Sequence, residues 1–142
     1  GRFDWVLVTN AEGLSTPRVY GELDDIRARL RADLPVVPVQ PHLEADLFHA
    51  LRAGDPARLA DALHNDLQQA ALALRPELAD VIELGLREGA LAGIVSGSGP
   101  TIALLCASAE SAINVQVAMI AAGHDSFHAH GPVAGARIVS TV

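Results

Sequence analysis

Apolar residues recur along the chain with two different spacings, and their succession predicts alternating strands and helices. The first apolar stretch covers residues 3–9, where Phe3, Trp5 and Leu7 would point to one side and Val6 and Val8 to the other. Because both sides are apolar, we expect a strand that is covered on both faces.

Apolar residues three or four positions apart then predict five helices. Thr16 is the expected N-cap of the first helix, with Pro17 in its first turn, and Ser108 is the expected N-cap of the last. Glycines at 54, 89 and 123 are placed to end three of the helices. The expected inward positions, helix by helix, are Val19, Leu23, Ile26 and Leu30; Leu43, Leu47, Phe48 and Leu51; Leu59, Leu63, Leu67, Ala71 and Leu74; Leu78, Val81, Ile82 and Leu86; and Ile113, Val117 and Ile120.

Two polar stretches are interpreted as features without a chemical role. The run His64-Asn65-Asp66 lies within the third expected helix, and we interpret it as a solvated helix face. Residues 33–41 carry a proline at every third position, which favours an extended connector between helices.

A short glycine-rich loop joins two further strands. Residues 93–95 and 102–106 are apolar, and the loop between them is too short for a parallel crossover, so the pair must be antiparallel. Two last strands are expected at 124–130 and 136–141, joined by a turn over 131–135. The order of elements predicts an α+β fold, a ferredoxin-like antiparallel sheet with helices packed on one face.

Composition limits the class of protein. The chain has 142 residues, half of them apolar, and a mean hydropathy of +0.28, which favours a single domain over residues 1–142 with one core. Neither a membrane-spanning run nor a signal peptide is evident, so we expect a soluble, cytoplasmic protein. A strand begins at once and no Met precedes it, which suggests the C-terminal part of a longer chain.

Charge excludes several kinds of chemistry. The net charge is −7, which argues against nucleic acid as a partner. All ten basic residues are Arg, so a Schiff base, a lysine general base and a lysine-dependent phosphate loop are excluded within this chain. The single cysteine, Cys106, lies in an apolar strand and is expected to be buried. His124, His128 and His130 make a zinc site conceivable, but histidines on an exposed strand are the more ordinary interpretation.

The glycine loop is where we place the chemistry. Gly97 and Gly99 can adopt positive φ and let another group approach the backbone amides, while Ser98 and Thr101 add hydroxyls that can donate to phosphate oxygens. A tight structural β-connection would have the same composition. The run is not a dinucleotide fingerprint, because no third glycine follows.

Four motifs together resemble the C-terminal half of the GHMP kinases. The segment Ser96-Gly97-Ser98-Gly99-Pro100-Thr101 is similar to a conserved segment of that family. The other motifs are similar to the members that phosphorylate a cytidine-diphosphate-linked methylerythritol. They are Leu14-Ser15-Thr16-Pro17 with Tyr20, His64-Asn65-Asp66-Leu67, and Pro76-Glu77-Leu78 leading to Gly89-Ala90.

The resemblance implies transfer of the ATP γ-phosphoryl group to the 2-hydroxyl of that substrate, a step of non-mevalonate isoprenoid synthesis. It implies that Tyr20 stacks on the cytosine, that Thr16 and Pro17 wall the same pocket, and that Gly97, Ser98, Gly99 and Thr101 support the phosphate site. From pattern alone, Tyr20 is better interpreted as a partly packed surface residue.

The family's catalytic Asp and Lys and its main phosphate loop belong to an N-terminal domain that this chain lacks. The resemblance implies that ATP and Mg²⁺ bind mainly to that domain, and that this chain carries no catalytic residue or metal ligand of its own. Two alternatives stay open: a GHMP kinase with another acceptor, such as homoserine or a mevalonate derivative, and a non-catalytic ferredoxin-like ligand-binding module.

Overall fold

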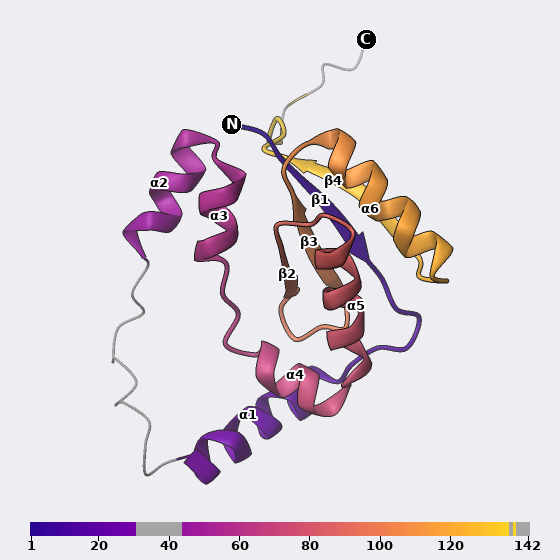
Figure 1. Cartoon of the computed structure of the whole chain (residues 1–142). Coiled ribbons are helices and arrows are strands. Elements are labelled where there is room, and N and C mark those ends of the chain that lie inside the picture. Colours follow the sequence, from indigo (N-terminus) through magenta and orange to yellow (C-terminus); the bar gives the residue numbers. More distant parts are fainter. Residues whose placement is uncertain (31–43, 137, 139–142) are drawn as a thin grey trace.

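The computed structural model of the chain describes residues 1–30, 44–136 and 138. Four strands and six helices lie in these residues (Figure 1). Their order is β1 (Phe3–Val8), α1 (Thr16–Leu30), α2 (Ala45–Ala53), α3 (Pro56–Ala62), α4 (Gln68–Leu74), α5 (Glu77–Arg87), β2 (Ala92–Val95), β3 (Ile102–Cys106), α6 (Ala109–Ala121) and β4 (Ser126–Gly131).

The four strands form one antiparallel sheet in the order β2-β3-β1-β4. Val8 pairs with Ile102 at one end of β1, and Asp4 pairs with Cys106 toward the other. This arrangement confirms the predicted α+β, ferredoxin-like fold. The expected connector over 33–41 lies outside the described residues, as do most positions of the strand expected at 136–141.

Helices cover the two faces of the sheet unequally. Val6, Val8 and Leu104 point to the face that carries the larger core, and α5 and α6 pack there. The helices α1 and α4 complete this core where β2 and β3 are joined, below the sheet in Figure 1. On the opposite face, α2 and α3 cover part of the sheet through a smaller cluster of Phe3, Ala50, Leu59 and Leu105.

Two helix predictions are wrong. The expected helix from 56 to 74 is two helices, because the chain leaves the helical path between Ala62 and Gln68. In α6 the expected inward residues point outward: Ile113, Val117 and Ile120 are 53%, 60% and 56% exposed, while Ala112, Val115 and Met119 are buried. Four of the other expected inward residues are also exposed, and these are Leu30, Phe48, Leu51 and Leu86.

The predicted helix ends are mostly confirmed. Gly54 has φ 66° and its N–H donates to the last carbonyls of α2, and Ser108 forms a reciprocal cap with Ser111 at the start of α6. Thr16 is the exception, since it is the first residue of α1, and the Val19 N–H donates to the carbonyl of Ser15. Within the described residues, no helix is long and apolar enough to span a membrane.

Candidate functional site

The glycine loop is a tight hairpin between β2 and β3. The Ser96 N–H donates to the Thr101 carbonyl at 2.8 Å, and the Gly99 N–H donates to the Ser96 carbonyl at 3.0 Å. Gly97 has φ 59°, and no residue other than glycine has positive φ in the described chain, a combination typical of a type II′ turn over residues 96–99. Gly99 has φ 79° and packs against Val95 and Leu14. Glycine is therefore required at 97 by the turn, and at 99 by both φ and space.

The loop contacts the beginning of α1. The hydroxyl oxygens of Thr16 and Ser98 lie 2.8 Å apart, close enough for one to donate to the other. Tyr20 is one turn further along α1 on the same face as Thr16, and its side chain is 54% exposed. Pro17 is exposed beside them. The structure thus brings Thr16 together with Ser98 and leaves the Tyr20 ring open to solvent one helical turn beyond this contact.

A residue that the sequence analysis placed on a solvated helix face also holds the loop. The side-chain amide of Asn65 donates to the carbonyls of Val95 and Gly97, at 2.8 Å each, while its oxygen accepts from the Leu67 N–H at 3.0 Å. The prediction for Asn65 was therefore wrong. The sequence carried a usable signal, because Asn favours turns in which its side chain accepts from the backbone two residues ahead. Thr101 contributes to the hairpin through its backbone carbonyl, which accepts from the Ser96 N–H.

A second side chain from the same segment anchors the strand rather than the loop. The side-chain oxygen of Gln68 accepts a hydrogen bond from the Val95 N–H at 3.0 Å. Val95 is the last residue of β2 and is fully buried. Gln68 and Asn65 therefore connect the start of α4 to the end of β2.

An open cavity of about 420 Å³ lies beside the loop on the sheet face opposite α5 and α6. Trp5, Ile94 and Ala103 form its apolar floor, and Ser96 and Gly97 form its rim. A second cleft of about 500 Å³ separates α1 from the segment of residues 63–72. Both cavities adjoin Asn65, and the first also borders the loop with space that a ligand or another domain can fill.

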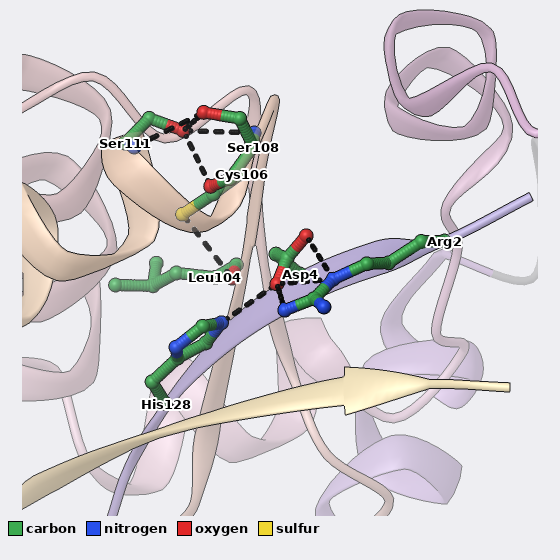
Figure 2. A network of polar contacts seen from close by, with 7 residues as sticks. All are labelled: Arg2, Asp4, Leu104, Cys106, Ser108, Ser111 and His128. Carbon is green, nitrogen blue, oxygen red and sulfur yellow. Dashed lines mark hydrogen bonds and ion pairs between the residues drawn. The ribbon is translucent and has the colours of Figure 1, made fainter. Parts of the chain in front are cut away.

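A charged network around Asp4 lies elsewhere in the fold (Figure 2). Asp4 is 4% exposed; the Arg2 guanidinium donates to it at 2.8 Å, and the His128 Nε2 lies 2.7 Å from it. The hydrogen bonds from Arg2, more than that from His128, hold the pKa of the Asp4 carboxyl below its usual value. Since Asp4 pairs with Cys106, this network is at the end of β1 away from the glycine loop.

Cys106 and His128 take part in structural contacts. Cys106 is fully buried, as predicted, and burial raises the pKa of its thiol to about 11, so the nucleophilic thiolate is suppressed. His128 is bonded to Asp4, and His130 lies two residues further along β4. Across residues 1–30, 44–136 and 138, no group of three His, Cys, Asp or Glu side chains is placed to hold a metal ion.

The site as a whole offers neutral hydrogen-bond donors, an exposed aromatic ring and open space. Ser98, Thr16 and the backbone amides of the loop can bind an oxyanion, and the Tyr20 ring can stack on a planar group. Among the described loop residues 96–101 there is no side chain that could act as a general base at neutral pH. The geometry fits a surface that positions a ligand rather than one that performs chemistry alone.

Comparison with known proteins identifies a family and close relatives. Residues 47–125 match the family model described as GHMP kinases C terminal. A protein of Clavibacter michiganensis subsp. michiganensis named 4-diphosphocytidyl-2-C-methyl-D-erythritol kinase is 51% identical over 140 residues, covering 99% of this chain and 45% of the relative. A protein of Thermobifida fusca with the same name is 50% identical over 141 residues, covering 98% of this chain and 43% of the relative. The chain therefore spans less than half the length of these relatives.

Solved structures share the fold at lower identity. A crystal structure of 4-(cytidine 5'-diphospho)-2C-methyl-D-erythritol kinase matches with a TM-score of 0.66 and 22% identity, covering 92% of this chain and 43% of that chain. A mevalonate kinase from L. major in complex with R-mevalonate matches with a TM-score of 0.59 and 20% identity, covering 85% of this chain and 39% of that chain. Structures with different acceptors thus share this fold, so the fold alone does not choose the acceptor.

Proposed function

The chain belongs to the GHMP kinase family and corresponds to its C-terminal domain; from this premise we propose that it is the substrate-side half of an ATP-dependent kinase. The proposed acceptor is the 2-hydroxyl of 4-diphosphocytidyl-2-C-methyl-D-erythritol, the substrate that gives its name to relatives about half identical over nearly the whole chain. The remaining half, an N-terminal domain with the ATP site, would be this chain's physical partner.

One contact carries the proposal, the hydrogen bond between the hydroxyls of Thr16 and Ser98. It joins the start of α1 to the glycine loop, so the exposed ring of Tyr20 and the loop amides belong to one surface. A cytidine diphosphate derivative presents a planar base and a charged phosphate chain. A stacking ring next to neutral amide and hydroxyl donors suits both parts of such a ligand.

In the proposed reaction the acceptor oxygen attacks the γ-phosphorus of ATP, the bond from that phosphorus to the β,γ-bridging oxygen breaks, and ADP leaves. The acceptor proton passes to a base outside this chain, which the family resemblance assigns to an Asp of the N-terminal domain. This chain would position the acceptor and place loop donors near the phosphates, which is how phosphoryl-transfer enzymes obtain much of their rate. We assign Mg²⁺ to the N-terminal domain and the ATP phosphates, as the family resemblance implies.

The acceptor can be tested on the complete enzyme, meaning this chain joined to the N-terminal half that its relatives carry. ADP release should depend on 4-diphosphocytidyl-2-C-methyl-D-erythritol and should be far slower with homoserine, mevalonate or phosphomevalonate. Preference for one of those acceptors would assign the chain to another GHMP kinase. No turnover with any of them would favour a non-catalytic binding module.

The isolated 142-residue chain provides the complementary measurement. We expect it to release no ADP above background, because it contains no lysine and no general base in the loop. Substrate-dependent ADP release from the isolated chain would refute the division of labour proposed for the two halves.

Tyr20 gives a sharper test of the base-binding surface. In the complete enzyme, Tyr20→Ala should raise the KM for the cytidine substrate about 2- to 13-fold, the equivalent of 0.5–1.5 kcal/mol of stacking, and leave the KM for ATP nearly unchanged. Tyr20→Phe keeps the ring and is the matched control. Equal increases in both KM values would count against stacking.

A further inference from the structure

Asn65 holds the glycine loop through two carbonyls that flank its first residue, Ser96. One side-chain amide thus donates to Val95, at the end of the strand, and to Gly97, inside the turn. Its third hydrogen bond, from the Leu67 N–H, fixes the orientation of the amide itself. Both N–H groups and the oxygen of the Asn65 side chain are therefore hydrogen-bonded, and a side chain with fewer donors could not make the same contacts.

The geometry of the peptide bond extends the effect of these contacts. In a trans peptide the C=O of one residue and the N–H of the next lie in one plane and point in opposite directions. The Val95 carbonyl points to Asn65, and the Ser96 N–H of the same plane points away, to the Thr101 carbonyl. By the same rule, the Gly97 carbonyl bound to Asn65 turns the Ser98 N–H away from Asn65.

The Ser98 N–H is a donor without an acceptor within the described part of the chain. The Ser98 hydroxyl lies 2.8 Å from the Thr16 hydroxyl, and the peptide plane before Ser98 is held through the Gly97 carbonyl. The residue is therefore fixed on two sides while its N–H stays free. A fixed, free backbone donor is the kind of group that stabilises negative charge as it develops, because no reorganisation is needed during the reaction.

From these contacts we infer that Asn65 is a positioning residue, which aims the Ser98 amide at a phosphoryl oxygen by fixing the Gly97–Ser98 peptide plane. The inference rests on the proposed kinase function and adds to it a residue that acts through the loop and touches no substrate. Asn65 would act mainly on the transition state, where charge on the transferred group is redistributed.

The test is Asn65→Asp in the complete enzyme. The substitution keeps the shape and the acceptor for Leu67, but it removes both donors and places a charge beside two carbonyls. We expect kcat to fall about 10- to 100-fold and both KM values to change less than about threefold. Gln68→Ala is the matched control, since it removes a bond to the end of β2 while leaving the loop carbonyls bound. It should lower the thermal midpoint measurably, because the Val95 N–H loses its acceptor, but change kcat less than about threefold.

A second measurement needs no turnover. In an amide NMR spectrum of the complete protein titrated with inorganic phosphate, the Ser98 resonance should shift in the parent and in Gln68→Ala, but shift much less in Asn65→Asp. If the parent phosphorylates no acceptor while the Ser98 pattern holds, the kinase proposal fails and the positioning role stands. The positioning role is overturned if Asn65→Asp keeps kcat within about twofold of the parent, or if Gln68→Ala lowers kcat as much as Asn65→Asp does. It is also overturned if the Ser98 amide resonance of the parent does not shift with phosphate.

Discussion

Asp4 shows how one buried carboxylate can make stability depend on pH. It is 4% exposed and bonded to Arg2 and His128, and the bonds from Arg2 are the main cause of its lowered pKa. A carboxyl group whose folded pKa lies below its unfolded value stabilises the fold above the unfolded value, near 3.8. That stability is lost as the pH falls through the folded pKa.

We therefore expect Asp4→Asn to lower the free energy of unfolding by about 1–3 kcal/mol at pH 7, since the donors of Arg2 and His128 lose a charged acceptor. The difference from the parent should shrink below about pH 4, where the parent carboxyl becomes protonated. Urea unfolding at several pH values measures both effects. Asp24→Asn, at an exposed position of α1, is the control and should change stability by less than about 0.5 kcal/mol. A difference that is constant from pH 7 to pH 3 would contradict the assigned role of the charge.

At the scale of residues, the sequence predicted the glycine turn between the two strands better than the contacts that hold it. Gly97, Gly99 and Ser98 were found from composition, because turns with positive φ select glycine. The roles of Asn65 and Asp4 were missed for one physical reason. Their partners, at 95–97 and at 128, are distant in sequence, and a polar residue does not reveal which distant group it binds.

At the scale of elements, α5 approaches the sheet closely because it carries a glycine at the contact. A Cβ at Gly85 would lie 2.6 Å from both terminal methyl carbons of Leu104, a fully buried side chain of β3. Alanine normally stabilises a helix relative to glycine by about 0.5–1 kcal/mol. Overpacking a core costs about 1–3 kcal/mol, so the packing term should dominate here.

Gly85→Ala should consequently lower the free energy of unfolding by about 1 kcal/mol, whereas Gly21→Ala in α1, where a Cβ meets nothing within 4 Å, should raise it by about 0.5–1 kcal/mol. Urea or thermal unfolding of the two variants decides the sign. Measured in a Leu104→Ala background, the cost of Gly85→Ala should disappear, because the smaller side chain at 104 leaves room for the methyl group. A stabilising effect of Gly85→Ala alone would mean that α5 shifts without cost.

The error in α6 shows what periodicity can and cannot predict. The helix is apolar nearly all round, so the spacing of Ile113, Val117 and Ile120 was as regular as that of Ala112, Val115 and Met119. Periodicity predicted the helix correctly but could not choose the buried face. The break between α3 and α4 was missed because the leucines continue at helical spacing across it.

At the scale of the whole molecule, the order of strands and helices was enough to predict the class of fold, since a hairpin and two crossovers leave few arrangements of an antiparallel sheet. Five strands were expected, and the described residues form four. The division of the core into two clusters was not predicted. One cluster contains seventeen buried residues on the α5–α6 face, and the other contains four, on the α2–α3 face. Unequal burial of this kind allows the smaller unit to open without unfolding the rest.

The two clusters can be compared by replacing one buried leucine of each with alanine. Leu59 in α3 and Leu78 in α5 are 3% and 2% exposed, so replacing either by alanine should cost the structure around it about 2–5 kcal/mol. Leu59 belongs to the smaller cluster and Leu78 to the larger. In amide hydrogen exchange followed by mass spectrometry, Leu59→Ala should accelerate exchange in α2 and α3 and leave α5 and the sheet close to the parent. Leu78→Ala should accelerate exchange everywhere.

The same measurement relates stability to the site. Asn65 lies between α3 and α4, but its contacts are with β2, the loop and Leu67, which are parts of the larger unit. Within residues 95–101, the hydrogen-bonded amides of Val95, Ser96 and Gly99 should therefore stay protected in Leu59→Ala and lose protection in Leu78→Ala. If Leu59→Ala instead exposes the loop as much as it exposes α2, the two clusters form one cooperative unit, and the glycine loop depends for its shape on both faces of the sheet.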